Sequence, residues 1–381
     1  MQLLAVFFFG ACGHAMFNNG RLLISLSSLG LGANAVGVGV LIALYGLMPV
    51  LLGVTLGRVV DRVGVRLPMM LSAGLLIVSM LVPLAWLSFA TLAFSSLSTG
   101  LAFMVTLVCT NKTVAALSSP EKRAGRLGWL AAAASAGGAI GPVIAGFSID
   151  HAGHQLTFGV IALIPLAALA SVFGWGRGYP GGVPAASTAA RGAMRDLWRD
   201  RRLRGMLMLA TVVPMALDTY LFFVPLIAAE RGWSASVTGL ILGFSVGAVV
   251  VARVLLPVAN RLMGPWGLLA ASYVAIGIGF FTLPVIEQPL TMLVVAAFVG
   301  VGTGVAPPVL TSLVYAASPP GRQGEVIGLR TSMQFGMGSV TPMIAGALGA
   351  LVGMSWVFVG IGVLLAGASR LCYARQKNAR S

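Results

Sequence analysis

Charged residues are scarce in this sequence: they make up 9% of its 381 residues, and only nine are acidic. A soluble globular domain carries about 25% charged residues. This chain therefore has too few to cover a water-exposed surface, which excludes a soluble enzyme. Intrinsic disorder is excluded too, because 58% of the residues are hydrophobic and disordered chains are poor in such side chains. The composition is that of a membrane protein with many spans.

Cysteine and histidine are also scarce, with three residues of each. The cysteines form no C-x-x-C pair and no disulfide framework. The histidines have no metal-ligand spacing with cysteines or carboxylates, so we expect no metal site and no cofactor. The G-x-x-x-x-G-K-[ST] pattern of a phosphate-binding loop is missing, which excludes ATP as the energy source through this chain. The residues concerned are Cys12, Cys109, Cys372, His14, His151 and His154.

Long hydrophobic runs, in contrast, fill the chain. Breaks at charges, prolines and Gly/Asn clusters leave twelve stretches of the roughly 20 mostly apolar residues that cross a bilayer as a helix. We therefore predict an all-α membrane protein with 12 transmembrane helices. The predicted spans are 3–29, 36–57, 68–87, 90–117, 128–149, 156–176, 204–229, 235–258, 266–286, 289–316, 324–350 and 355–373.

The net charge of +15 rests on 24 Lys and Arg residues. If the N-terminus is cytoplasmic, 22 of them fall in loops or helix ends on that side, and only Arg21 and Arg231 fall on the other. This asymmetry follows the positive-inside rule, so we expect cytoplasmic N- and C-termini and a multi-pass protein of the cytoplasmic (inner) membrane. In a soluble protein such a charge would suggest nucleic acid. Here it sets topology, and we expect no nucleic-acid partner.

One long polar segment divides the chain into two halves. We predict an N-terminal six-helix bundle over residues 1–176 and a C-terminal six-helix bundle over residues 204–381. Residues 177–203 are predicted to form a cytoplasmic linker with a short amphipathic helix at the inner leaflet.

The two halves repeat each other at an offset of 200 residues. Gly138 and Pro142 in the fifth predicted helix correspond to Gly338 and Pro342 in the eleventh. Parallel repeats of this kind are related by an axis along the membrane normal, and they place a binding site between the halves near mid-membrane. We therefore expect two pseudo-symmetric bundles around a central substrate cavity.

A charged motif follows the second predicted helix. Gly57, Asp61, Arg62, Gly64 and Arg66 form the pattern G-x-x-x-D-R-x-G-x-R in a segment predicted to be a loop. Together with twelve helices in two halves and a long central linker, this pattern resembles the major facilitator superfamily. The resemblance covers the whole chain.

The resemblance implies that the charged motif is a cytoplasmic gate. In the family, the Asp and Arg of the motif latch the two halves together, and the Asp faces the start of the eleventh helix. In this chain Asp61 would lie against a helix N-terminus near residues 322–326, where the helix dipole favours an anion. Asp61 would then stabilise the outward-open state. The alternative is a loop whose Arg residues only set topology.

A glycine motif lies in the fifth predicted helix. Gly137, Gly141, Pro142 and Gly146 follow the pattern G-x-x-x-G-P-x-x-G-G, with Ala145 replacing one glycine. This pattern resembles the one associated with exporters of the superfamily. Small residues let helices pack closely, and a proline permits a kink. Helix packing without an export role is the alternative, because the eighth predicted helix has a similar run at Gly239, Gly243 and Gly247.

Asp218 is the only acid deep inside a predicted span. An ionisable side chain at mid-bilayer costs about 2.5–3.5 kcal/mol on insertion scales, so it needs a reason. A carboxyl in a low-dielectric cavity can hold a proton near neutral pH, which is what a proton carrier needs. We predict that Asp218 couples transport to protons. The alternative is a structural carboxylate permanently paired with a base.

Three polar residues of the first predicted helix share one face. His14, Asn18 and Arg21 are spaced i, i+4 and i+7, which aligns them along the helix. We expect this face to line the substrate cavity, with Arg21 pairing with Asp218 or binding an anionic group of the substrate. The alternative for Arg21 is snorkelling to the outer interface.

Three further residues are predicted to line the same cavity. Asn111 lies low in the fourth helix, and Arg330 and Gln334 share a face of the eleventh. The alternative for Arg330, and also for Lys112 and Arg253, is contact with lipid phosphates of the inner leaflet.

These features predict a secondary active transporter, not an enzyme, that works by alternating access. We expect proton-coupled export of a small organic solute, a drug or a metabolite, by a monomer surrounded by membrane lipid. Deep basic residues outnumber the single deep acid, so symport or exchange of an organic anion such as a carboxylate is one alternative. A lipid flippase or a transport-dead receptor is another.

Overall fold

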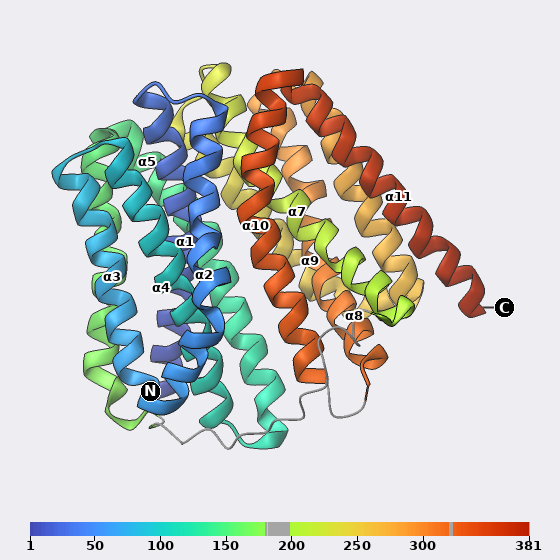
Figure 1. The fold of residues 1–381 in the computed structure, drawn as a ribbon, viewed down its shortest axis with the longest axis horizontal. Coiled ribbons are helices and arrows are strands. Elements are labelled where there is room, and N and C mark those ends of the chain that lie inside the picture. Colours follow the sequence, from blue (N-terminus) through green and yellow to red (C-terminus); the bar gives the residue numbers. More distant parts are fainter. Residues whose placement is uncertain (180, 182–198, 320–322, 381) are drawn as a thin grey trace. The chain divides into compact units, whose positions relative to one another are not determined.

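The computed structural model describes residues 1–179, 181, 199–319 and 323–380. Residues 182–198 of the predicted linker, and Arg322 at the start of the predicted partner region of Asp61, lie outside this part. The helices that the structure describes are shown in Figure 1. They are α1 (Gln2–Gly30), α2 (Ala35–Val63), α3 (Arg66–Ala85), α4 (Phe89–Ala116), α5 (Pro120–Trp175), α7 (Arg201–Glu230), α8 (Ala235–Thr282), α9 (Pro289–Ala317), α10 (Gln323–Val352), α11 (Met354–Arg380) and the short 3₁₀ turns Gly176–Gly178 and Leu283–Val285.

Two of these helices are broken by a glycine. Gly153 in α5 has φ 78° and Gly264 in α8 has φ 72°, a conformation that side chains with a Cβ rarely adopt. Each break falls between two predicted spans, so the ten described α-helices contain the twelve segments that the hydropathy predicts. In the described part of the chain, nine helices are long and apolar enough to cross a membrane, and α1 is not among them.

The less apolar α1 is enclosed by other helices of the chain. It packs on α4 and α5. A Cβ built on Gly13 would lie 2.6 Å from Thr106 of α4, and one built on Gly10 would lie 2.9 Å from Leu130 of α5. Because other helices separate much of α1 from lipid, it can carry polar side chains that a lipid-facing helix could not.

Gly57, Asp61 and Arg62 of the charged motif lie in a helix where a loop was predicted, so that expectation is wrong. Helix α2 continues through Val59, Val60 and Val63 and therefore includes Asp61. It ends at Gly64, whose φ of 82° terminates the helix, and α3 begins two residues later. The tight turn holds Asp61 on a rigid helix rather than on a loop.

The chain divides into two compact units. Unit 1 comprises Met1–Ala186 together with Phe222–Val246, and unit 2 comprises Ser187–Leu221 together with Gly247–Ser381. Unit 1 thus groups the end of α7 and the start of α8 with α1–α5, so the division into residues 1–176 and 204–381 stays a prediction from the repeat.

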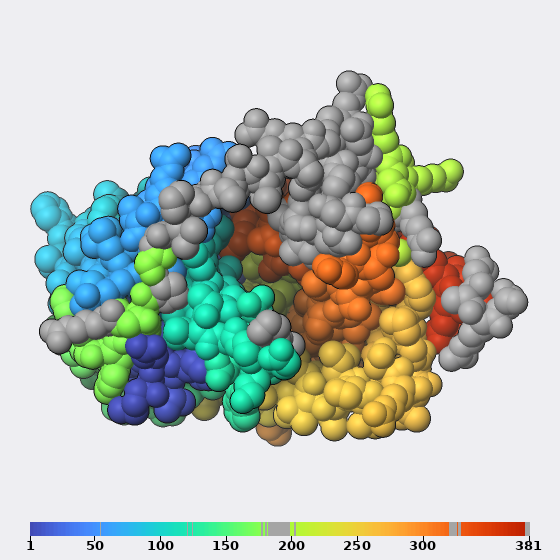
Figure 2. Space-filling view, turned by 90° about the horizontal axis from the view of Figure 1, so that it is seen from below, coloured from blue at the N-terminus to red at the C-terminus, as the bar shows by residue number. Residues whose placement is uncertain are grey.

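Each unit has its own apolar core. In unit 1, Val6 and Phe9 of α1 are buried with Leu130 of α5, and Figure 2 shows the start of α1 (dark blue) beside the first part of α5 (teal). In unit 2 the second segment of α8 is central. The Tyr273 hydroxyl donates to the Leu209 carbonyl of α7 at 2.7 Å, and Ser369 of α11 donates to the Ala270 carbonyl at 3.1 Å.

Candidate functional site

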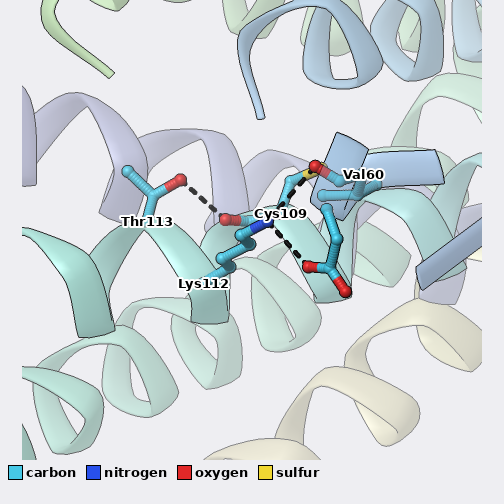
Figure 3. A network of polar contacts seen from close by, with 5 residues as sticks. Val60, Cys109, Lys112 and Thr113 are labelled. Carbon is cyan, nitrogen blue, oxygen red and sulfur yellow. Dashed lines mark hydrogen bonds and ion pairs between the residues drawn. The ribbon is translucent and has the colours of Figure 1, made fainter. Parts of the chain in front are cut away.

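The acid of the charged motif forms an ion pair inside unit 1. The Lys112 Nζ of α4 lies 2.7 Å from Asp61 Oδ1 and also donates to the Val60 carbonyl at 3.2 Å. Figure 3 shows the ammonium between these two acceptors. About half of the Asp61 side chain (48%) is exposed, against 27% for Lys112. Lys112 therefore has a carboxylate partner within unit 1.

The other residues of the charged motif surround this pair along the chain. Gly57 precedes it by one turn of α2, and a Cβ built there would meet nothing within 4 Å. Arg62 is exposed, Gly64 forms the turn, and Arg66 opens α3 half-buried. The motif is therefore a basic, partly exposed helix end whose single acid, Asp61, is paired with Lys112.

The polar face predicted on α1 is split between neighbours. His14 lies edge-on against Phe103 of α4, with ring centroids 4.9 Å apart, and its Nδ1 is 3.0 Å from the Gly10 carbonyl. Asn18 points instead toward α5, because its Nδ2 would be 2.7 Å from a Cβ on Gly138. The shared spacing thus places the two residues at adjoining helix contacts.

Arg21 is enclosed by aromatic rings. Its guanidinium carbon lies 4.5 Å from the centroid of the Phe17 ring and 5.9 Å from that of the Tyr45 ring. The residue is only 9% exposed. A cation over ring faces is stabilised by the ring quadrupoles. The buried position favours a role inside the bundle over snorkelling to the interface, and the predicted pairing with Asp218 stays a prediction.

Asn19, next to Asn18, was not singled out from the sequence. It is fully buried, and neither its amide nitrogen nor its amide oxygen has a hydrogen-bond partner in the described part of the chain. Burying an unsatisfied amide costs about 1–3 kcal/mol by protein mutagenesis. Two adjacent Asn residues inside a predicted membrane span, Asn18 and Asn19, were the sequence feature that could have pointed to it. The second of them is buried among the helices and needs a polar partner.

The glycine motif of α5 brings backbones together on two sides. A Cβ on Gly137 would collide with the Ala11 carbonyl of α1, and one on Gly141 would be 2.6 Å from the Ala15 carbonyl. A Cβ on Gly146 would collide with the Ala235 carbonyl of α8. The motif therefore fixes α5 against α1 with one part and against α8 with another.

The glycines of α8 are the other side of the same contact. A Cβ on Gly239 would collide with the Pro142 carbonyl, and one on Gly243 would be 2.7 Å from the Ala139 carbonyl. The two small-residue runs therefore meet each other within unit 1. Sequence spacing identified both runs but not their pairing.

Asp150 completes this contact three residues before Gly153, where the first segment of α5 ends. Its Oδ1 accepts from the Ala235 backbone N–H at 3.0 Å and its Oδ2 from that of Ser236 at 2.8 Å. The Ser234 hydroxyl accepts from the next N–H, that of Val237, at 3.2 Å. Three of the four N–H groups that a helix start leaves without a partner are thus satisfied, two by a carboxylate that the helix dipole favours.

Asp218 lies in unit 2, twelve residues before the end of α7 at Glu230. This places it about 18 Å from that end at 1.5 Å per residue. It is half-buried, and its Oδ2 would be 3.0 Å from a Cβ on Gly338 of α10. The carboxyl therefore faces α10, where a side chain in place of Gly338 would cover it.

The remaining predicted cavity residues are dispersed. Arg330 is half-buried on α10 and Gln334 is exposed one turn further. Asn111 is exposed and donates to the Leu107 carbonyl of its own helix at 2.7 Å. Within the described ranges no cluster of three His, Cys, Asp or Glu could hold a metal ion.

The family model of the Major Facilitator Superfamily matches residues 3–342. The chain belongs to this superfamily, which makes it a transporter of small solutes rather than an enzyme and gives it the twelve-helix, two-domain fold. Among curated protein sequences, none shows a significant match.

Solved transporter structures share the fold at low identity. A POT family transporter in complex with 5-aminolevulinic acid has a TM-score of 0.81 at 12% identity, covering 99% of this chain and 96% of its own. The nucleoside transporter NupG has 0.75 at 15%, covering 98% and 99%. A D-xylose–proton symporter has 0.76 at 16%, covering 97% of each chain.

The ion pair at the basic end predicts a small but measurable coupling. Asp61→Asn and Lys112→Met should be non-additive, with a coupling energy of about 0.2–1 kcal/mol, since the pair is partly exposed. A double-mutant cycle of equilibrium unfolding in mixed micelles measures it. Arg62→Gln, one residue along, is the control and should be additive with Lys112→Met. Full additivity of the Asp61 pair would contradict the assignment.

The capping carboxylate predicts a local change at the start of α8. Asp150→Ala should speed amide hydrogen exchange in the first turn of α8 about tenfold, the equivalent of about 1.4 kcal/mol, because two N–H groups lose their acceptor. Asp150→Asn should have a smaller effect, since an amide oxygen still accepts one bond. Exchange measured by mass spectrometry checks both, with Glu287→Gln as the control. Unchanged exchange in Asp150→Ala would rule out the cap.

Proposed function

We propose that this transporter exports a small organic solute in exchange for protons, with Asp218 as the proton carrier. The observation that carries the proposal is the position of this carboxyl. In the described membrane helices it is the one acid far from a helix end or break, it is half-buried, and glycine is the residue facing it. A carboxyl so placed is accessible to a small solute and expensive to keep charged within the membrane.

The contact between α5 and α8 supports alternating access. The two helices belong to different halves of the sequence repeat, so opening this end requires the glycine faces to separate and the Asp150 bonds to break. Faces made of Gly and Ala carry no long side chains that must be repacked. The resemblance of the α5 run to an exporter motif, now paired with the α8 run, favours export over import.

In unit 1 we propose His14, Asn18 and the neighbouring Asn19 as polar contacts for the substrate. Asn19 supplies a donor and an acceptor that have no partner in the described part of the chain. Asn19 is fully buried in this conformation, so a hydroxyl, amide or amine of a substrate would satisfy these atoms only in a conformation that opens this part of α1. Phe17 and Phe103, stacked at 4.1 Å between centroids, would supply apolar contact for a lipophilic substrate.

The alternative of organic anion transport depends on Arg21. An anion receptor needs a guanidinium that can reach the solute, and Arg21 is enclosed by Phe17 and Tyr45 at 9% exposure. This enclosure is why we place proton-coupled transport of a cationic or neutral solute first.

Replacing the buried amide separates a structural role from a binding role. Asn19→Leu should raise stability by about 1 kcal/mol, since an unsatisfied buried amide is removed, and should weaken binding of the substrate at least about tenfold. The measurements are thermal unfolding and the melting-temperature shift produced by tetraphenylphosphonium. Ser72→Ala, which removes a buried hydroxyl already bonded to the Met69 carbonyl, should leave that shift unchanged. Lost stability with unchanged binding would identify Asn19 as structural.

Neutralising the proposed carrier tests the coupling. Purified protein in liposomes that contain a pH-sensitive dye should move protons when tetraphenylphosphonium is added. Asp218→Asn should reduce this proton movement at least about tenfold while still exchanging labelled for unlabelled tetraphenylphosphonium, because only the titratable proton site is lost. Glu230→Gln at the end of α7 is the control. Proton movement that survives in Asp218→Asn would refute the carrier role, and benzoate transport lost in Arg21→Gln would establish the anion alternative.

A further inference from the structure

Unit 2 contains a groove that the proposed transport mechanism does not use. It lies between the second segment of α8 and the end of α11 and has a volume of about 540 Å³. Gly267, Ala270 and Ala271 line it on the α8 side. Leu262 and Tyr373 at its edge are 77% and 66% exposed, so the groove is open along the side of the helices.

The floor of the groove is held in place by two hydrogen bonds between its walls. The Gln376 amide of α11 donates to the Met263 carbonyl at 2.9 Å, and the Ser369 hydroxyl donates to the Ala270 carbonyl at 3.1 Å. Gln376 also occupies the space above Gly267, where a Cβ would be 2.8 Å from its amide. The hollow between these bonds is therefore a fixed feature of the α8–α11 packing.

The length of the groove matches one leaflet of a bilayer. It extends from the turn at Gly264 to Val274, which is ten residues or about 15 Å of helix. The hydrocarbon core of a bilayer is about 30 Å thick. The groove as a whole is therefore about as long as one leaflet is thick, and its part beyond Ala270 is where the first carbons of an acyl chain would lie.

The polar residues gather where a lipid headgroup would lie. Arg370 lines the groove and is exposed, and among the described residues no carboxylate lies within ion-pair distance of it. Tyr373 adds a hydroxyl one turn nearer the turn at Gly264. Both lie at the end of the helices that the positive-inside count assigns to the cytoplasm.

The charge of this region selects an anionic ligand. Residues 258–286 and 354–381 contain no Asp or Glu. Basic pockets between transmembrane helices on the cytoplasmic side bind the headgroups of anionic lipids. The basic residues of the same two segments are Arg261, Arg370, Arg375, Lys377 and Arg380.

We propose that this groove binds one anionic phospholipid of the cytoplasmic leaflet. Arg370 and Tyr373 bind its phosphate, and one acyl chain lies along Ala271 and Val274, beyond the Gln376 side chain that covers Gly267. The bound lipid fills the gap between α8 and α11 and supplies the counter-charge that this part of the chain lacks. The site is separate from Asp218 and from the α5–α8 contact, so it stands or falls independently of the proposed function.

Native mass spectrometry of the full chain tests the proposal. The detergent-purified protein is stripped of lipid and titrated with dioleoyl phosphatidylglycerol or dioleoyl phosphatidylcholine. The wild type should bind one phosphatidylglycerol at least about tenfold more tightly than phosphatidylcholine. Arg370→Gln should lower the affinity for phosphatidylglycerol about tenfold through loss of the phosphate contact. Ala271→Phe should lower the affinity for both lipids by filling the groove.

Lys377→Gln is the matched control, since this exposed basic residue is on the same helix but does not line the groove. It should bind phosphatidylglycerol as the wild type does. Each variant must elute as a single species with wild-type helical content. Equal affinity for the two lipids, equal loss in Arg370→Gln and Lys377→Gln, or dimers that disappear in Ala271→Phe would each overturn the proposal. The last result would make the groove a contact between copies of the chain.

Discussion

The close approach of α1 to its neighbours is the constraint on which the polar chemistry of unit 1 depends. A helix that carries Asn18, Asn19 and Arg21 cannot face lipid, because each of these side chains needs a polar or aromatic partner. Gly137 and Gly141 let α5 contact the backbone of α1 directly. The glycines are thus what allows a weakly apolar helix to stay in the membrane.

Two carboxylates of unit 1, Asp61 and Asp150, each link two helices. Asp61 is paired with a lysine ammonium at the basic end, and Asp150 accepts hydrogen bonds from the backbone N–H groups at the start of α8. The first contact joins two helices of one sequence half. The second joins helices of different halves, so it must respond to any motion that separates them. The Asp61–Lys112 pair therefore stabilises one half, whereas the Asp150 cap stabilises the contact between the halves.

Hydropathy and glycine positions predicted most of the fold. The twelve segments, and the breaks near Gly153 and Gly264, follow from apolar length and from backbone angles that only glycine adopts readily. Pairings between distant segments could not be predicted in this way. In the site, the partners of Asp61 and Asp150 lie 51 and 86 residues away along the chain, and each partner alone looked like an ordinary residue at a helix end. The α2 boundary was misplaced because charge was taken to end a helix that its valines continue.

The glycine and alanine faces of α5 and α8 also have an entropic consequence. A contact between long side chains freezes their rotamers each time it closes, at up to about 2 kcal/mol for each flexible residue. The closest approaches of this contact bring Gly146, Gly239 and Gly243 against the backbone of Ala235, Pro142 and Ala139, and Val143 is the branched side chain that also reaches Gly243. Gly, Ala and Pro have no rotamers to lose, and Val has one torsion. Closing the contact therefore costs almost no side-chain conformational entropy, and opening it regains almost none. The balance between the open and closed states of this end is left to enthalpy and to the hydration of the separated backbones.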